Sequence, residues 1–398
     1  MMVTIASLLS LLVALNLFLV LLQAMAQRAV IETEAPPLPK EFPPVSILKP
    51  LKGVDADLKE NLRSLYRIEY PNFEVILGTE DARDPALALA QRVAAEFPDI
   101  RSVVLSSGTA IGFNPKVNNL ANLVLRARHP LLLISDSNVR VPQDYLKDLV
   151  AHRVQAGGGL VWSLFRGIHG SGLGGMLEAM QLNNPVMGGV SALMRVLRVP
   201  CCVGKSMLLH RDELEAIGGF RFLGQFLAED QVCAEEFDRL GRPVTVSGNL
   251  IDNVLGRRTL REFIGRHLRW ARLRRHVHLA GYVGEILLNP VFVALVALAA
   301  VRTPDAAIVA GLTLIGMSVM NASTDRVLGL RKPAWAHPLL ELALSVSRGV
   351  LWFVPFFSRT VVWRGNVLAL GPRSQIELKE AAPVDDGLFD TRERHAPA

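Results

Sequence analysis

The stretch that decides the fold is HPLLLISDSNVR, residues 129–140, where four aliphatic residues in a row lead to Ser135 and then Asp136. An apolar run of this length between turn-forming residues indicates a strand buried on both faces, as in a sheet covered by helices. Asp136 then lies at the carboxyl end of the strand, where open α/β sheets bind their ligands. A hard cation with a diphosphate suits such a carboxylate. The alternative is that Asp136 only caps a turn before a helix that begins near Pro142.

Strand and helix patterns alternate on both sides of this stretch. Short aliphatic runs are separated by segments whose apolar residues recur at helical spacing. This alternation predicts an α/β fold with a parallel, helix-covered sheet of nucleotide-binding type. The expected strands are 45–48, 73–78, 103–105, 131–134, 160–163, 202–209 and 244–247, and the first two expected helices are 58–66 and 86–97.

Charged residues gather where these elements begin or end. Asp84 follows an early strand, Lys116 lies near a helix start, and Glu229 and Asp230 open a later helix. A Lys at a helix start can reach phosphate oxygens, although a solvated Lys is the simpler interpretation. Acids in a first turn favour the helix dipole and need no further role. The pattern therefore indicates candidates for a phosphate or metal site without choosing among them.

The N-terminal segment has the composition of a membrane span. Residues 3–25 are nearly all apolar, and their length is about that needed to cross ~30 Å of hydrocarbon. A cleaved signal peptide is the alternative, but the segment lacks a basic start and its apolar run is long for one. We therefore predict a retained transmembrane anchor over residues 1–27, followed by a stiff Pro-rich linker over 28–44.

Two further apolar segments lie beyond Trp270. Residues 283–301 and 306–323 are each long enough to span a bilayer, and the short segment 302–305 joins them. Length and spacing together predict a transmembrane hairpin.

A third apolar segment, 334–357, contains Glu341 and Arg348. Charges at mid-bilayer are costly unless they pair or line a site, so a span, a re-entrant helix and an interfacial helix all stay open. The predicted membrane part is 281–360. The remainder, 361–398, reads as a polar tail, and we predict disorder in its part after Gly371.

Charge and cysteine content limit the possible partners and compartments. Lys and Arg number 43 against 37 Asp and Glu, and residues 257–275 alone hold eight Arg and one Glu. Such a cluster indicates cytoplasmic juxtamembrane charge facing anionic lipid. No nucleic-acid partner is expected, because no stacking series or binding motif accompanies the cluster. The three cysteines show neither metal-ligand spacing nor a disulfide framework. We predict a multi-pass integral membrane protein whose main domain faces the cytoplasm, in a bacterium at the inner membrane.

Taken together, Asp84, Asp136, Asp230 and the segment RHLRW, residues 266–270, resemble the D, D, D, (Q/R)xxRW signature of lipid-directed and processive inverting glycosyltransferases with the GT-A fold. More narrowly, the chain resembles glycosyltransferase family 21, the ceramide glucosyltransferases. The segments that carry this likeness are ILKPLKGVD (47–55), DPA (84–86) and NPKVNNL (114–120). The resemblance implies a cytoplasmic GT-A catalytic domain, Rossmann-like and nucleotide-sugar-binding, over 45–280, with an N-terminal transmembrane helix and C-terminal membrane helices.

The resemblance also implies a UDP-sugar donor and a role for each donor-side residue. Asp84 contacts the uridine, Lys116 lies near the diphosphate, and Asp136 holds a divalent cation, Mg²⁺ or Mn²⁺. The pattern departs from the usual DxD at Asn138, which replaces the second metal carboxylate. One carboxylate with the diphosphate can still suffice for Mg²⁺. Asp230 is the base that takes the proton from the acceptor hydroxyl.

The remaining implied residues lie toward the acceptor, a ceramide-like membrane lipid. Arg266, Arg269 and Trp270 close over the diphosphate and the acceptor mouth. For Arg269 and Trp270 an interfacial anchor is the alternative, because both residue types favour the headgroup level. Cys202 lies near the acceptor groove, or it is a buried structural thiol.

Three hypotheses for function follow. The first is a membrane-bound inverting transferase that moves a hexose, most readily glucose, from its UDP form to the hydroxyl of ceramide or a similar lipid. The second keeps this chemistry and changes the acceptor to a hopanoid or diacylglycerol, with UDP-N-acetylglucosamine as a possible donor. The third is a transferase-like membrane scaffold without catalysis, which Asn138 keeps open. A processive polysaccharide synthase is disfavoured, because so few spans offer little material for a polymer channel.

Overall fold

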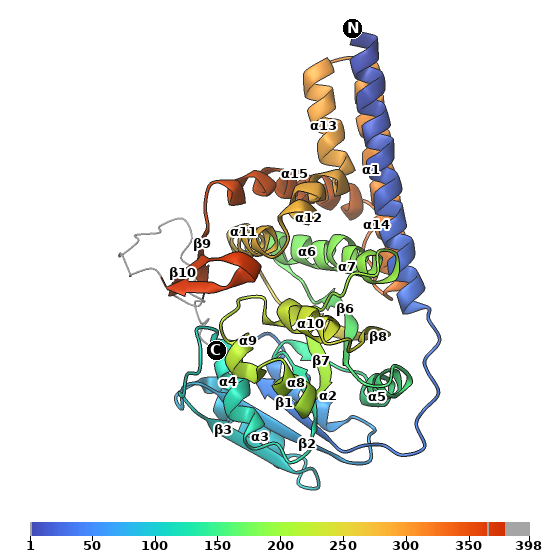
Figure 1. The fold of residues 1–398 in the computed structure, drawn as a ribbon. Helices are drawn as coiled ribbons and strands as arrows, with labels where there is room; N and C mark the ends of the chain where they lie inside the picture. Colours follow the sequence, from blue (N-terminus) through green and yellow to red (C-terminus); the bar gives the residue numbers. More distant parts are fainter. Residues whose placement is uncertain (1, 364–365, 379–398) are drawn as a thin grey trace. The chain divides into compact units, whose positions relative to one another are not determined.

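The computed structural model describes residues 2–363 and 366–378 (Figure 1). The chain divides into two compact units. The sheet unit consists of Ala26–His169 and Gly189–Gly256. The helical unit consists of Met1–Met25, Gly170–Gly188 and Arg257–Ala398. Each unit is described by itself.

The sheet unit is built on a mixed sheet with the strand order β3-β2-β1-β4-β7-β6-β8-β5. The half from β3 to β4 is parallel, whereas β7 pairs antiparallel with both β4 and β6. The predicted α/β fold is thus confirmed, and the sheet is parallel except where β7 and the short β5 pair antiparallel with their neighbours. The strands are β1 Val45–Pro50, β2 Phe73–Thr79, β3 Ser102–Ser106, β4 Leu131–Ser135, β5 Val139–Arg140, β6 Leu160–Ile168, β7 Ser206–His210 and β8 Val244–Val254.

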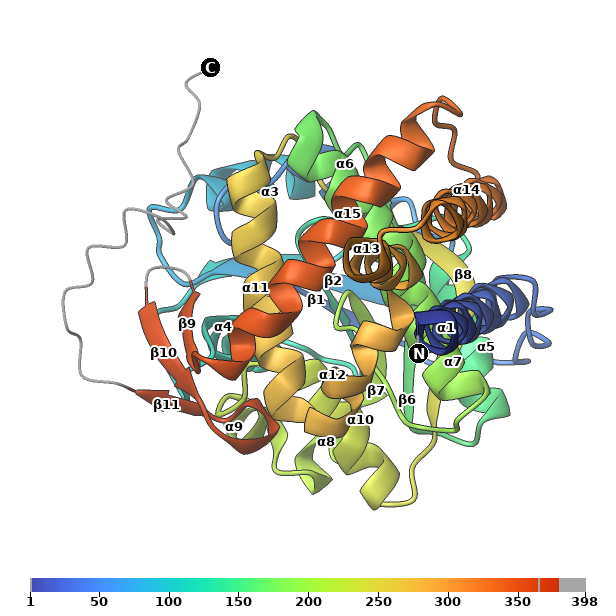
Figure 2. The ribbon, with the colours of Figure 1, turned by 90° about the horizontal axis from the view of Figure 1, so that it is seen from above.

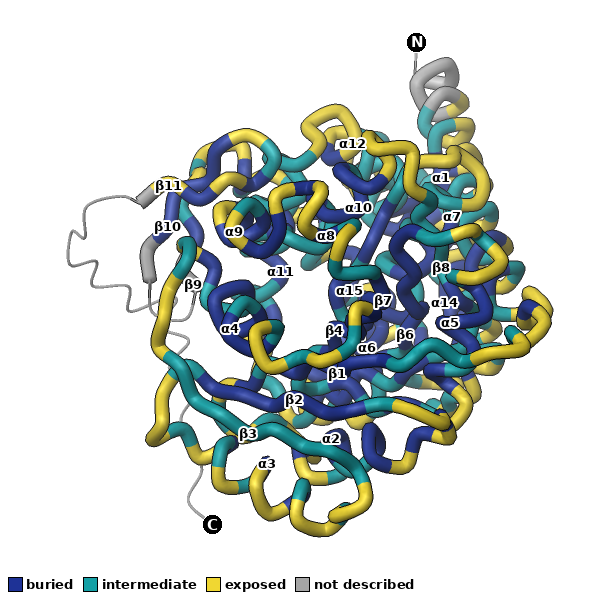
Figure 3. Tube along the Cα trace, turned by 60° about the horizontal axis from the view of Figure 1, so that its bottom comes forward, coloured by how far each residue is buried: buried dark blue, intermediate teal, exposed yellow. Residues whose placement is uncertain are grey.

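The strand that precedes Asp136 is buried along its whole length, as its run of aliphatic residues predicts. It lies between β1 and β7, and Figure 3 shows the neighbouring β1 and β2 as buried too. Helices supply the covering layers. They are α2 Leu58–Tyr66, α3 Pro85–Ala95, α4 Pro115–Val124, α5 Tyr145–Gln155, α8 Arg211–Ala216, α9 Gly219–Leu223 and α10 Glu229–Arg239.

The helical unit contains long apolar helices and shorter ones that cross them. Figure 2 views α1, α13 and α14 nearly end-on, while α11 and α15 lie lengthwise in the same view. The helices are α1 Met2–Ile31, α6 Gly172–Gln181, α11 Leu260–Val277, α12 Leu279–Gly284, α13 Pro290–Val301, α14 Pro304–Val327 and α15 Ala336–Phe353. A π-helical segment, Leu182–Val186, follows α6, and α7, Met187–Arg195, continues from it into the sheet unit.

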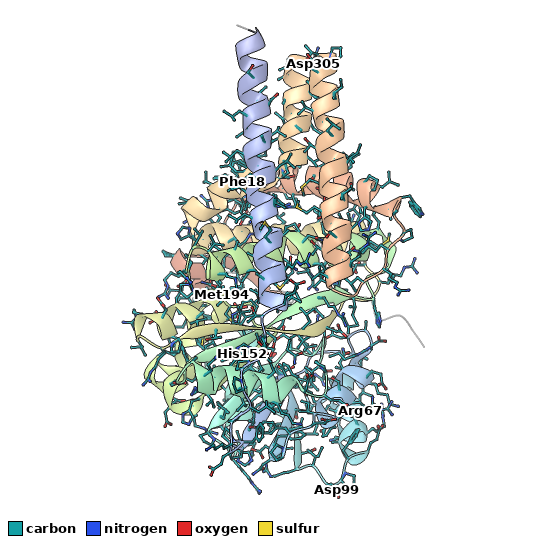
Figure 4. All side chains as sticks on the ribbon, turned by 90° about the vertical axis from the view of Figure 1, so that its right-hand side faces the viewer. Phe18, Arg67, Asp99, His152, Met194 and Asp305 are labelled. Carbon is teal, nitrogen blue, oxygen red and sulfur yellow. The ribbon has the colours of Figure 1, made fainter. Side chains whose placement is uncertain are left out.

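In the described part of the chain, three helical segments are long and apolar enough to cross a membrane: Leu9–Ile31, Pro304–Val327 and Ala336–Phe356. Phe18 on the first of these is 60% exposed, and Figure 4 shows Asp305 at the far end of the α13–α14 hairpin. Val13, Ala294 and Ala310 pack together, one each from α1, α13 and α14. Large apolar side chains left uncovered along such helices suit a lipid environment.

The hairpin is present, but its first arm is not the continuous span expected over 283–301. Leu279–Leu288 and Pro290–Val301 meet at a bend of 69°. The break falls at Asn289, which has non-helical backbone angles because a residue before Pro is disfavoured in the helical region. The side chain of Asn289 caps α13 and donates from Nδ2 to the carbonyl of Ser345, 2.9 Å away. The 12-residue α13 alone is therefore shorter than a full span.

The third apolar segment runs across α13 and α14 rather than alongside them (Figures 1 and 2). This orientation favours an interfacial helix over a span. Glu341 does not pair with Arg348 among the described residues. Instead its Oε2 accepts from Asn321 Nδ2 at 2.6 Å and its Oε1 from Ser345 Oγ at 2.7 Å. Glu341 and Arg348 are thus each held by different, uncharged hydrogen-bond partners.

The expected polar tail is partly structured. β9 Thr360–Trp363, β10 Asn366–Leu370 and β11 Ile376–Leu378 form a small antiparallel sheet. Val361 and Leu368 are buried there. Apolar and β-branched residues in these short runs favour strands over disorder. The later part of the tail, 379–398, lies outside the described residues.

Candidate active site at the carboxyl end of β4

Asp136 follows β4 directly, and a buried lysine on the neighbouring strand β1 binds its backbone carbonyl. Lys49, on β1, is fully buried, and its Nζ donates to the carbonyl of Asp136 at 2.7 Å and to that of Val139 at 3.1 Å. Burial lowers the pKa of Lys49 to about 7, against the opposing carboxylates of Asp136 and Asp55. These bonds hold the turn after β4 in one conformation.

The carboxylate of Asp136 lies between two ammonium groups. Lys116 Nζ is 2.8 Å from Oδ1, and Lys205 Nζ is 3.0 Å from Oδ2. Lys205 Nζ also donates to Asn138 Oδ1 at 3.1 Å. Burial alone raises the pKa of Asp136, but the two lysines outweigh burial and hold this pKa well below its usual range. Asp136 is therefore ionised at any physiological pH.

The first turn of α10 brings two more carboxylates to the same place. Glu229 Oε1 is 3.0 Å from Lys116 Nζ, so Lys116 bridges Asp136 and Glu229. Asp230 Oδ2 accepts from the Gly204 N–H at 2.6 Å, and its Oδ1 accepts from the Gln231 N–H at 2.8 Å. Burial, and next the charge of Glu229, raise the pKa of Asp230 to about 6, with Lys116 opposing. A carboxylate with this pKa can accept a proton near neutral pH.

Two short segments position these acids. Asn114 caps α4 through Oδ1, and its Nδ2 donates to the Phe226 carbonyl at 2.8 Å and to Glu229 Oε2 at 3.1 Å. Gly204 touches Asp230 so closely that a Cβ at position 204 would lie 2.8 Å from the Cβ of Asp230. Asn114 thus ties the start of α4 to the start of α10, and only glycine fits against Asp230 without a shift.

The sequence left the structural environments of Asp84 and Cys202 open. Asp84 caps α3 by accepting from the Ala86 N–H, and it also accepts from the Gly53 N–H at 2.9 Å. This structural role fixes the loop after β1, and the contact of Asp84 with uridine stays a prediction. Cys202 is buried, and burial raises the pKa of its thiol well above the usual value. A nucleophilic role for this thiol is thereby disfavoured.

The RHLRW segment belongs to α11 in the helical unit. Arg266 Nε lies 3.5 Å from Oε1 of the buried Glu178, and the Arg266 guanidinium carbon lies 6.0 Å from the centre of the Trp270 ring. Trp270 in turn stands edge-on to His267. These contacts order Arg266 and Trp270 on α11, while the closing of Arg266, Arg269 and Trp270 over a diphosphate stays a prediction.

Sequence reasoning gave Lys205 no role. Gly204-Lys205-Ser206 resembles the end of a phosphate loop but lacks the upstream Gly of that motif. The structure uses Lys205 differently: β7 pairs antiparallel with β4 so that Ser206 faces Ser135, and Lys205 therefore comes opposite Asp136. The sequence shows that Lys205 is a cation directly before a strand. It does not show that Asp136 is the partner of Lys205, because that depends on the pairing of β4 with β7.

The donor atoms here are compatible with a hard divalent cation. Asp136 Oδ2 and Asn138 Oδ1 both lie about one hydrogen-bond length from Lys205 Nζ, at 3.0 and 3.1 Å, so the two oxygens converge on one point. Oxygen ligands suit Mg²⁺ and Mn²⁺. Among the described residues no cluster of three His, Cys, Asp or Glu side chains could hold a metal ion. Further ligands would therefore have to come from a diphosphate and water.

Curated relatives of this chain include two ceramide glucosyltransferases. Ceramide glucosyltransferase 1 of Caenorhabditis elegans is 25% identical over 359 residues, covering 83% of this chain and 72% of that protein. The ceramide glucosyltransferase of Komagataella phaffii is 26% identical over 298 residues, covering 61% of this chain and 58% of that protein.

A solved structure shows the same fold. The mannosyltransferase PcManGT of Pyrobaculum calidifontis, in complex with GDP-Man and Mn²⁺, superposes with a TM-score of 0.51 and 18% identity, covering 88% of this chain and 98% of its own. The likeness indicates a GT-A glycosyltransferase fold, and the apolar helices mark a membrane protein. The family model named Glycosyl transferase family 21 matches residues 8–376. By that match, which takes in nearly the whole chain, this sugar-transferring enzyme belongs to glycosyltransferase family 21.

Proposed function

We propose that the chain transfers a hexose, most readily glucose, from UDP-glucose to the primary hydroxyl of ceramide or a similar membrane lipid, with inversion at the anomeric carbon. The names of its curated relatives support glucose as the sugar and ceramide as the acceptor. The observation that carries the proposal is the cluster at the end of β4. An ionised carboxylate held by two lysines there stands beside a second carboxylate whose pKa is raised to about 6.

The lysines and Asp136 form the donor side of the site. Breaking the bond between the anomeric carbon and UDP leaves charge on the diphosphate, and the partly buried Lys116 and Lys205 carry the ammonium groups available to stabilise it. Asp136 and Asn138 would hold a divalent cation, which when bound supplies further stabilisation of the leaving phosphate. Asp84 contacts the uridine in this proposal.

Asp230 supplies the base. It takes the proton from the acceptor hydroxyl as that oxygen bonds to the anomeric carbon, and UDP departs with the electron pair of the broken bond. Attack from the face opposite UDP converts an α-linked donor into a β-glycoside. A carboxylate with a pKa of about 6 is mostly ionised at neutral pH and still basic enough to accept the proton.

The acceptor side completes the proposal. Arg266, Arg269 and Trp270 would close over the diphosphate and the mouth through which the lipid enters, and Cys202 would lie near the groove for the lipid. The chain would be a multi-pass protein with its catalytic domain, residues 45–280, on the cytoplasmic face. The Arg-rich segment 257–275 supports that orientation.

The test uses purified full-length protein in detergent with UDP-glucose, ceramide and Mg²⁺, followed by mass spectrometry of the lipid product. We expect one hexose added to ceramide with an equal amount of UDP released. Hopanoid and diacylglycerol acceptors and UDP-N-acetylglucosamine, run in parallel, identify the alternative specificity. If no pair of donor and acceptor releases UDP, this result would support the scaffold hypothesis and overturn the proposed catalysis.

A further inference from the structure

A cavity of about 40 Å³ lies within the helical unit, between α11, α12 and α15. This is several times the ~10–15 Å³ that one water needs, and it leaves room for a small tetrahedral anion. Its wall combines polar and aromatic side chains. Those on which the argument rests are His267, Arg274, Tyr282, Glu285, Arg348 and Trp352.

The two arginines of the cavity differ in how their charge is balanced. Arg274 makes a two-pronged pair with Glu285, from Nε to Oε1 at 2.6 Å and from Nη2 to Oε2 at 3.0 Å. Arg348 forms no ion pair among the described residues, and its Nη2 donates only to the carbonyl of Leu288, 3.2 Å away. A guanidinium charge removed from water and left without a counter-charge is costly. The cavity therefore holds one arginine that no carboxylate of the described residues contacts, since Glu341 and Glu285 act on Arg348 only from beyond ion-pair distance.

His267 adds a second polar group without a partner. It is 7% exposed, it lines the cavity, and its Nε2 has no hydrogen-bond partner among the described residues. Buried polar atoms are almost always satisfied. An oxyanion in the cavity would accept from His267 Nε2 and pair with Arg348.

This cavity is separate from the arginines of the glycosyltransferase signature. Phe263, His267 and Arg274 recur at helical spacing on one stripe of α11 and face the cavity. Arg266 and Arg269 fall on another stripe of the same helix, because consecutive helical residues turn by about 100°. Arg266 accordingly contacts Glu178 instead.

The position of Arg348 indicates where the anion comes from. Arg348 lies on Ala336–Phe356, one of the segments apolar enough to enter a membrane. Val346, Val350 and Phe353, near it in the sequence, are 39%, 56% and 49% exposed, as expected for side chains covered by acyl chains. Charged residues in such segments are rare and mark functional sites.

We propose that this cavity binds the phosphate of an anionic membrane lipid, with Arg348 and His267 as its donors and with the acyl chains along α15. Ceramide carries no charge, so this lipid is distinct from the acceptor, and the inference goes beyond the proposed transfer reaction. Tyr282 and Trp352 form one wall of the cavity and hold each other in place. The Tyr282 hydroxyl donates to the Trp352 carbonyl at 2.8 Å, and Trp352 Nε1 donates to the Tyr282 carbonyl at 2.9 Å.

The experiment measures the thermal midpoint of the full-length protein in detergent while dihexanoyl phosphatidate is titrated. Dihexanoylglycerol and inorganic phosphate are titrated separately. We expect phosphatidate to raise the midpoint by several degrees and the other two compounds to have little effect. An equal shift with inorganic phosphate would overturn the lipid as the source of the anion. An equal shift with dihexanoylglycerol, or no shift with any compound, would overturn the anion site.

Variants then assign the effect to the cavity. Arg348→Gln should raise the half-saturating phosphatidate concentration about tenfold or more, because it removes a hydrogen bond to a charged group. Arg302→Gln, which removes an exposed arginine from the hairpin turn, is the matched control and should leave that concentration unchanged. An equal loss in both variants would indicate general surface attraction and overturn the proposal. If Arg348→Gln does not fold, Arg348→Lys and His267→Phe replace it, and wild-type affinity in both would overturn the proposal.

Discussion

Replacing Asp230 by Asn tests the assignment of the catalytic base most directly. The change keeps the size of the side chain and removes its ability to take a proton. General-base catalysis contributes roughly 10²–10⁴-fold to rate, so kcat should fall by a factor in this range. The fold should persist, because only one of the two hydrogen bonds that Asp230 accepts, from Gly204 and Gln231, has to be given up. That loss is worth about 1–3 kcal/mol of unfolding free energy, because one backbone N–H is left without its acceptor.

The pH dependence gives an independent readout of the same residue. The pKa of Asp230 is raised to about 6, and the base works only when ionised. In the wild type, kcat/KM should therefore be constant above about pH 7 and fall as pH drops through 6, reaching roughly a tenth of its plateau at pH 5. In Asp230→Asn the small residual activity should lose this limb.

The assay follows UDP release from pH 5 to 9, with UDP binding measured by calorimetry in parallel. Asp238→Asn is the control, since Asp238 lies exposed on the same helix and should behave as wild type. UDP binding should survive in both variants. If Asp230→Asn keeps more than about a tenth of the wild-type kcat, or retains the acid limb, then Asp230 is not the base.

Three further changes address two residues beside Asp136 and Asp230 and one residue of the helical unit. Lys205→Met should raise the KM for the UDP-sugar about tenfold, because one charge-assisted hydrogen bond to the diphosphate is lost. The same variant should bind Mn²⁺ in the absence of the UDP-sugar, because Asp136 no longer pairs with Lys205 Nζ, 3.0 Å away in the wild type. Electron paramagnetic resonance detects the bound Mn²⁺. Gly204→Ala places a Cβ 2.8 Å from that of Asp230 and should lower kcat while calorimetry shows UDP binding intact. Glu341→Leu leaves two buried hydrogen-bond donors without their acceptor, so the thermal midpoint should fall, with about 1–3 kcal/mol lost for each donor.

Local patterns predicted the parts of the site that depend on neighbours in sequence. The aliphatic run before Asp136 had to be a buried strand, and Asp136 had to emerge at its carboxyl end. The helix start expected near Lys116 is also present, and Asn114 and Pro115 explain it, because they begin α4 with a side-chain cap and a proline in the first turn. In both places the physics involves only a few consecutive residues, so the sequence suffices.

Features that depend on strand pairing or helix packing could not be predicted in this way. Lys205 reaches Asp136 only because β7 runs antiparallel beside β4, and nothing local reveals that direction. The break at Asn289 had a visible cause in the following Pro290, yet hydropathy averaged over the segment concealed it. Hydropathy also concealed the short strands that begin at Thr360, since a polar tail can still hold apolar residues at alternate positions.

The two aspartates of the site have opposite pKa shifts, and this difference supports the roles proposed for them. Asp136 is flanked by Lys116 and Lys205, so it stays ionised and is a poor proton acceptor. Asp230 is buried to a similar degree, but Lys116 pairs with its neighbour Glu229 instead, and burial therefore raises the pKa of Asp230. Environments that push two carboxylates apart in pKa separate the charge-stabilising group from the proton-transferring group. A bound diphosphate would draw Lys116 toward its oxygens and add negative charge nearby, which makes Asp230 a stronger base when the donor is in place.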